Sequence, residues 1–163
     1  MTEELMADMG RYVVGHNPST LIALGLGSCI GCAIYDKEKR IGGLAHVMLP
    51  ESRECMKGNE GLNMNKFADV AIPSMVDEMK HKGCSIDRMT AKIAGGAHMF
   101  KGLIESETMD IGKRNDNAVR EELKKLKIPL LAHETGGFIG RTIRFDTVTG
   151  KLTIKTKDEV KEI

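Results

Sequence analysis

Apolar residues recur along this chain with two different periods. Helical spacing in residues 64–82 and 115–127 predicts two helices, and Pro73 predicts a kink or an early break in the first. Short apolar runs between glycines and polar residues predict strands instead. These runs are residues 10–15, 20–26, 30–35, 41–48, 86–93, 128–133, 139–145 and 151–155.

Two helices among roughly eight short strands, without regular alternation, predict an α+β fold built as a mixed β-sheet sandwich. We expect residues 1–163 to form one domain, since this length can bury a sizeable core. The polar segment 51–61 is a candidate mobile lip beside a site. The charged tail from Lys157 is expected to fray.

The strands 30–35 and 41–48 predict a hairpin closed by Asp36-Lys37-Glu38-Lys39. Pairing Tyr35 with Arg40 places Cys29 directly opposite His46. Directly opposed residues share a sheet face with Cβ atoms about 4.5–5.5 Å apart, so a sulfur–imidazole contact is within reach. A slip of one residue would send the two side chains to opposite faces.

A thiol facing an imidazole is a candidate nucleophile and base, because a free thiol is only slightly ionised at neutral pH. The run Gly25-Leu26-Gly27-Ser28-Cys29 precedes the hairpin. Glycines let the backbone turn sharply, so Gly27 and Ser28 are candidates for the turn and oxyanion hole, with the Cys29 amide as a donor. The alternative is a turn that only permits tight strand packing. Ile30 and the strand after it argue against a nucleotide fingerprint.

Composition narrows the function classes. A formal charge of +1, an aromatic content of 4% and the absence of Trp give no case for nucleic-acid binding. No apolar run approaches the roughly 20 residues of a membrane helix, so we expect no membrane insertion. The acidic start Met1-Thr2-Glu3-Glu4 lacks the basic region of a secretory signal, which predicts a cytoplasmic location.

Four cysteines in a chain of this size do not indicate a disulfide framework. In a strand, Cys29 and Cys32 point to opposite faces, which argues against a redox or metal pair, and no second pair completes a zinc site. We expect no metal or cofactor. For the other polar side chains we expect structural or surface roles. These are inert thiols (Cys32, Cys55, Cys84), surface histidines (His16, His81, His133), a candidate pocket histidine (His98), a helix cap (Asn115) and a solvated strand face (Arg141, Arg144).

The motifs Leu24–Cys29 and Gly43–Pro50 together resemble the chemoreceptor glutamine deamidase family, CheD. Further matches are Lys92–Ala97, Ile111–Asn115, Thr135–Gly137 and Gly140-Arg141. The resemblance implies hydrolysis of glutamine side-chain amides to glutamate on methyl-accepting chemotaxis receptors, with Cys29 as nucleophile and His46 as general base and acid. It also implies a regulatory complex with a CheC-type phosphatase.

One position departs from the family pattern. The family has a threonine six residues before the cysteine, thought to orient the histidine, and this chain has Ala23 there. A main-chain carbonyl or another hydroxyl such as Thr135 could replace it, or the activity could be weak or lost. Two alternatives therefore stay open: a non-catalytic regulatory partner of a CheC-type phosphatase, and a thiol hydrolase acting on small amides or thioesters.

Overall fold

The computed structural model describes residues 2–52, 63–99 and 110–163. Within them the chain forms two five-stranded sheets and two α-helices. The strands are β1 (Glu3–Met6), β2 (Tyr12–His16), β3 (Ser19–Leu26), β4 (Ile30–Asp36), β5 (Ile41–Val47), β6 (Met89–Gly95), β7 (Leu130–Thr135), β8 (Arg141–Asp146), β9 (Leu152–Lys155) and β10 (Val160–Glu162). The helices are α1 (Ala68–His81) and α2 (Ile111–Lys125), and 3-10 turns lie at Met64–Lys66 and Ile86–Arg88.

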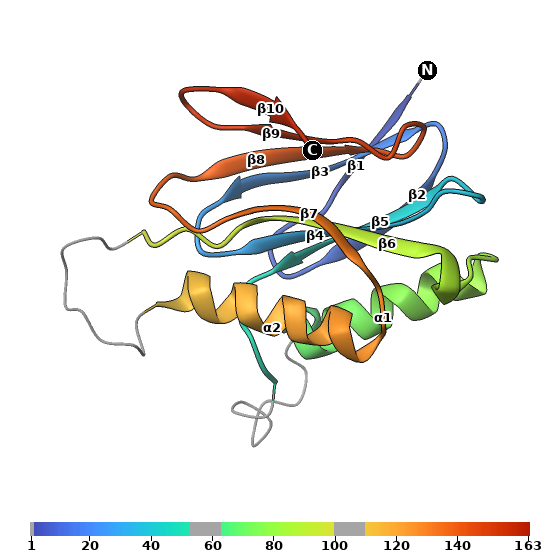
Figure 1. Cartoon of the computed structure of the whole chain (residues 1–163), viewed down its shortest axis with the longest axis horizontal. Helices are drawn as coiled ribbons and strands as arrows, with labels where there is room; N and C mark the ends of the chain where they lie inside the picture. The colour runs from blue at the N-terminus through green and yellow to red at the C-terminus, as the bar shows by residue number, and fades with distance from the viewer. Residues whose placement is uncertain (1, 53–62, 100–109) are drawn as a thin grey trace.

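The two sheets and the helices form three layers (Figure 1). The outer sheet has the order β1-β3-β8-β9-β10, and the middle sheet has the order β2-β5-β4-β6-β7. Both helices lie on the face of the middle sheet that is turned away from the outer sheet. Most neighbouring strands are antiparallel, while β1–β3 and β6–β7 are parallel. The expected α+β sandwich with two main helices is confirmed.

Strand alternation divides the core into two parts. Along β4, Ile30, Cys32 and Ile34 pack with the buried faces of α1 and α2, while Ala33 and Tyr35 pack against the outer sheet. The strand is buried on both faces, which explains its nearly continuous apolar sequence. The side chains that face the space between the sheets are therefore the odd-numbered residues of β4.

Lys92 of β6 joins the two sheets. Its Nζ donates hydrogen bonds of 2.9 Å to the carbonyl oxygens of Gly150 and Ile163, which lie next to strands of the outer sheet. Burial lowers the pKa of this ammonium group.

Several predicted elements differ at their ends. The first predicted helix divides into the 3-10 turn Met64–Lys66 and α1, and α1 continues through Pro73. The second helix begins at Ile111 rather than Asn115. The expected fraying of the tail is wrong, because β10 pairs with β9 from Val160 to Glu162. β1 is not among the predicted strands, and the predicted lip at 51–61 falls almost entirely outside the described residues.

Neither helix in the described part of the chain is long and apolar enough to cross a membrane.

Candidate active site

The hairpin β4–β5 forms, but two residues away from the predicted register. Asp36 pairs with Ile41 and Gly31 pairs with His46, so Cys29 is not directly opposite His46. The turn consists of residues 37–40, because Arg40 adopts a left-handed φ of 52° and Asp36 belongs to the strand. The fully buried carboxylate of Asp36 is held by Arg88, the Ser85 amide and two amides of the turn.

A shift of two residues preserves the strand face. Gly31 and His46 face each other across the ladder, and Cys29 lies two residues before Gly31. Cys29 belongs to the core between the sheets, together with Ala33 and Leu44. Cys29 and His46 are therefore diagonal neighbours, whose Cβ atoms are typically about 7–8 Å apart or somewhat less. Gly31 contributes no side chain between them.

His46 is held from behind by the segment that follows β1. Its ring Nδ1 lies 3.0 Å from the carbonyl oxygen of Ala7, and its main-chain N–H donates to Arg11 O at 2.9 Å. A carbonyl can only accept, so Nδ1 carries the proton and Nε2 has a free lone pair. Nε2 is buried and has no hydrogen-bond partner among the described residues.

Burial sets the protonation states of both groups. It lowers the pKa of His46, although the Ala7 hydrogen bond and the charge of Asp8 oppose this shift. It raises the pKa of the Cys29 thiol. At neutral pH the resting pair is therefore a neutral thiol and a neutral imidazole rather than an ion pair. No hydrogen bond joins Cys29 to Nε2 in this structure, and Cys29 retains 8% exposure.

The turn Gly27-Ser28-Cys29 is fixed through its three carbonyl groups. Gly27 O accepts from the Ala97 amide at 2.8 Å, and Cys29 O accepts from the Gly96 amide at 2.8 Å. Ser28 O accepts from the Asn115 side chain at 3.0 Å. Among the described residues, the amides of Ser28 and Cys29 have no acceptor. Within the described residues, the turn thus has two N–H groups without an acceptor, and N–H groups of this kind are what an oxyanion hole uses.

Asn115 is not the helix cap that its position suggested. The cap of α2 is Asp110, whose side chain accepts from the Lys113 amide at 3.0 Å. Asn115 is fully buried, and its Nδ2 bonds to Met48 O at 2.9 Å as well as to Ser28 O. One signal could have revealed this role: Asn115, Val119 and Leu123 form a buried stripe at a spacing of four residues, with a polar residue where an apolar one is expected.

Arg141 is also misassigned by the alternating pattern. Its side chain is 6% exposed, and its guanidinium donates to the carbonyl oxygens of Gly95, Glu134 and Gly136. This guanidinium fastens the β7–β8 loop to the end of β6 beside the Cys29 turn. Arg144 is exposed as expected and bonds to Glu4.

None of the remaining candidate residues has a hydrogen bond to Cys29 or to the ring of His46 among the described residues. Ala23 is fully buried in the same core as Cys29. Thr135, a suggested substitute for the family threonine, instead donates to Asp116 at 2.9 Å. Cys32 packs against the helices with its pKa raised by burial to about 12, and His16, His81 and His133 are exposed. His98 packs against the Phe138 ring, and Cys55 lies outside the described residues.

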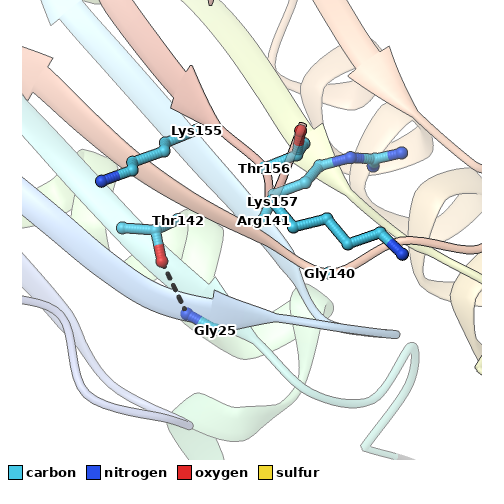
Figure 2. A pocket seen from close by; sticks show the side chains of 7 residues that line it. All are labelled: Gly25, Gly140, Arg141, Thr142, Lys155, Thr156 and Lys157. Atoms are coloured by element: carbon cyan, nitrogen blue, oxygen red, sulfur yellow. Dashed lines mark hydrogen bonds between the residues drawn. The ribbon is translucent and has the colours of Figure 1, made fainter. Parts of the chain in front are cut away.

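A polar pocket of about 410 Å³ lies on the Gly25 side of the turn. Figure 2 shows the Gly25 amide bonded to Thr142, with Lys155 and Lys157 on the neighbouring strand and turn. Its lining includes neither Cys29 nor His46. The pocket is therefore lined by basic side chains and does not contain the candidate pair. No cluster of metal-ligating side chains occurs in residues 2–52, 63–99 and 110–163.

Comparison with known proteins gives a consistent family. Residues 48–156 match the family model CheD, described as CheD chemotactic sensory transduction. A Clostridium botulinum (strain Hall) protein named probable chemoreceptor glutamine deamidase CheD is 51% identical over 154 residues, covering 94% of this chain and 93% of the relative. A Desulforamulus reducens protein of the same name is 46% identical over 153 residues, which cover 94% of this chain and 90% of the relative. The family-model match begins after Cys29 and His46, so it does not bear on their roles.

Proposed function

Because this chain belongs to the CheD family, we propose that it hydrolyses the side-chain amides of selected glutamines on chemoreceptors, which yields glutamate and ammonia. We place the reaction at Cys29 and His46. The observation that carries this assignment is the ring of His46. Its Nδ1 is engaged by Ala7 O, while Nε2 is a buried acceptor without a partner among the described residues, on the face that Cys29 shares.

The first half of the reaction forms a thioester. His46 Nε2 takes the thiol proton as Cys29 Sγ bonds to the amide carbon, and the carbonyl electron pair moves to oxygen. The amides of Ser28 and Cys29 stabilise this oxyanion. When the carbonyl re-forms, the C–N bond breaks and the imidazolium donates its proton to the departing nitrogen, so ammonia leaves.

The second half returns the enzyme to its starting state. A water molecule loses a proton to His46 Nε2 and attacks the thioester carbon. Collapse of that adduct breaks the C–S bond, Cys29 regains its proton from the imidazolium, and glutamate is released. A neutral resting pair suits this cycle, because His46 must start each half-reaction as a base.

Ala7 supplies the orientation that the family resemblance assigns to a threonine. Ala23 cannot accept the imidazole N–H, but the Ala7 carbonyl does so at 3.0 Å. Since this bond fixes the ring and its tautomer, the alanine at position 23 does not by itself remove the base.

Three point variants test the proposal. We expect Cys29→Ala and His46→Ala to lose at least about 100-fold in deamidation rate, since each removes a group that bonds to or exchanges protons with the reacting atoms. Cys32→Ala is the matched control, because Cys32 is a buried thiol on the opposite face of β4 and should retain activity. The measurement is mass spectrometry of purified receptor cytoplasmic domains, where each deamidation adds about one dalton.

Other outcomes would redirect the assignment. Full activity in Cys29→Ala would refute the thiol mechanism.

We also propose a complex with a CheC-type phosphatase in the cytoplasm, as the family resemblance implies. Tight phosphatase binding without deamidation of any receptor would favour a purely regulatory role, and turnover confined to small amides or thioesters would favour a general thiol hydrolase.

A further inference from the structure

Asn115 lies where the β4–β5 ladder ends. The last pair of the ladder is Ile30 with Val47, and Cys29 and Met48 lie one step beyond it. Cys29 is already in the irregular turn, and Met48 follows the end of β5. Past this pair, the ladder no longer holds Cys29, whereas His46 remains inside it, paired with Gly31.

The Asn115 carboxamide connects these two segments. Its Nδ2 donates to Ser28 O at 3.0 Å and to Met48 O at 2.9 Å. Ser28 directly precedes Cys29, and Met48 follows His46 by two residues. One side-chain nitrogen with two hydrogens thus takes the place of the next rung of the sheet. Because both acceptors are carbonyls, they also fix which end of the amide is nitrogen.

The carbonyl oxygen of the Asn115 side chain makes no favourable polar contact with the described residues. Asn115 is fully buried, and its Oδ1 has no hydrogen-bond partner among the described residues. An unpaired buried acceptor is unfavourable, so an apolar side chain would be the simpler choice for packing α2. The two donated bonds are the contribution that an apolar residue could not make.

We infer that Asn115 is a positioning residue that sets the placement of Cys29 relative to His46. This inference rests on the proposed function. Asn115 does not meet the substrate; it acts through the carbonyls of Ser28 and Met48. Loss of its donors removes the Ser28 anchor and leaves the turn held only through the carbonyls of Gly27 and Cys29. The turn can then shift away from the imidazole, so proton transfer becomes slower.

The test compares Asn115→Leu with Thr147→Val. Leucine removes both donors and places an apolar side chain with the same branching in the buried position. Thr147 is a matched control because it is fully buried and bonds to Ser19 at the outer sheet, away from Cys29. For Asn115→Leu we expect kcat to fall at least about 30-fold with KM within about threefold. Thr147→Val should lose thermal stability while kcat stays within about threefold.

The pH profile separates positioning from simple stability. If Asn115 positions the pair, the rate of Asn115→Leu should no longer show the acid limb of His46 and should rise with pH as the thiolate forms, as in His46→Ala. A merely structural Asn115 would leave the wild-type profile in place. Asn115→Asp keeps the side-chain shape while losing the donor nitrogen, and it serves the same test if the leucine variant does not fold.

Two results would overturn the inference. One is a folded Asn115 variant with wild-type kcat and pH profile, and the other is an equal loss of kcat in Thr147→Val. Failure of the proposed function is distinguishable, because it appears as no deamidation by the wild type or as activity in Cys29→Ala, whatever the Asn115 variants do. Inactive Cys29→Ala combined with active Asn115→Leu would reject only the positioning role.

Discussion

His46 is a titratable side chain held almost wholly out of water, at 2% exposure. Burial lowers its pKa, and the Ala7 hydrogen bond and Asp8 charge only partly offset this shift. We therefore predict that kcat/KM for deamidation stays constant from neutral pH down to about 6.5 and falls only below that value. A pH series from 5 to 8 measures this, and an acid limb centred above pH 6.5 would contradict it.

The same shift affects stability with a definite sign. Between about pH 6.5 and the lower pKa of the folded protein, the unfolded chain binds a proton at His46 that the folded protein does not bind. The unfolding free energy therefore falls as pH falls through this window, by up to about 1.4 kcal/mol per pH unit. Above that range His46 contributes no slope. Urea unfolding of wild type and His46→Gln checks this, since the variant should lack that part of the pH dependence.

At this scale the sequence pointed to a candidate pair of side chains, whereas the groups that hold the pair in place came only from the fold. Cys29 and His46 were named from chemistry, spacing and family resemblance. The Ala7 carbonyl could not be predicted as the partner of His46, because every residue carries one and only the fold selects it. Asn115 was mistaken for a cap because the helix was started four residues late, although its place in the buried stripe carried a usable signal.

At the scale of elements, Gly95 determines how closely β6 can approach the Cys29 turn. Its φ is +115°, and a Cβ there would lie 2.2 Å from the backbone oxygen of Cys29. We predict that Gly95→Ala lowers the unfolding free energy by about 3 kcal/mol or more and also lowers deamidation, because the clash is with backbone that cannot rotate away.

Gly136→Ala is the control for that prediction. Gly136 also has a positive φ, of +87°, but a Cβ there meets nothing within 4 Å. Its cost should be limited to about 1–2 kcal/mol of backbone strain, with activity retained. Urea unfolding and the deamidation assay measure both variants, and equal losses in the two would contradict the steric argument.

Elements were predicted well where period and length agreed. The hairpin β4–β5 was expected, but its register was not. Hydrophobic alternation determines which face of the sheet a residue occupies, and a shift of the pairing by two residues leaves every residue on the same face. Asp36 decided the register: a charged residue at a strand end suggests a turn, yet Arg88 and three backbone amides hold it inside the sheet. The short strands β1 and β10 have too few apolar residues to be distinguished from loops.

At the scale of the whole molecule, the two sheets approach closely at Gly31. A Cβ on Gly31 would lie 2.3 Å from Ile143 Cδ1 of β8 in the outer sheet. We predict that Gly31→Ala lowers the unfolding free energy by about 1–3 kcal/mol through overpacking. Ile143→Val removes the clashing methyl, so the double variant should be more stable than the sum of the single changes predicts.

A double-mutant cycle by urea unfolding gives that coupling. Strictly additive effects would show that the clash is relieved elsewhere. The sandwich class followed from the mixture of strands and helices, but the division of strands between two sheets did not. The neighbours β3–β8 and β6–β7 are far apart in sequence, and their pairing depends on the assembled core rather than on local pattern.

The acceptor behind His46 is a main-chain atom, and this affects how the chain can vary. No point substitution at position 7 deletes a carbonyl, so alanine scanning would pass over this partner and sequence comparison would not reveal it. Ala7 is 1% exposed, which means that the position is constrained in size rather than in chemistry. Because Ala7 provides the acceptor, residue 23 does not have to supply a hydroxyl, and Ala23 only packs in the core.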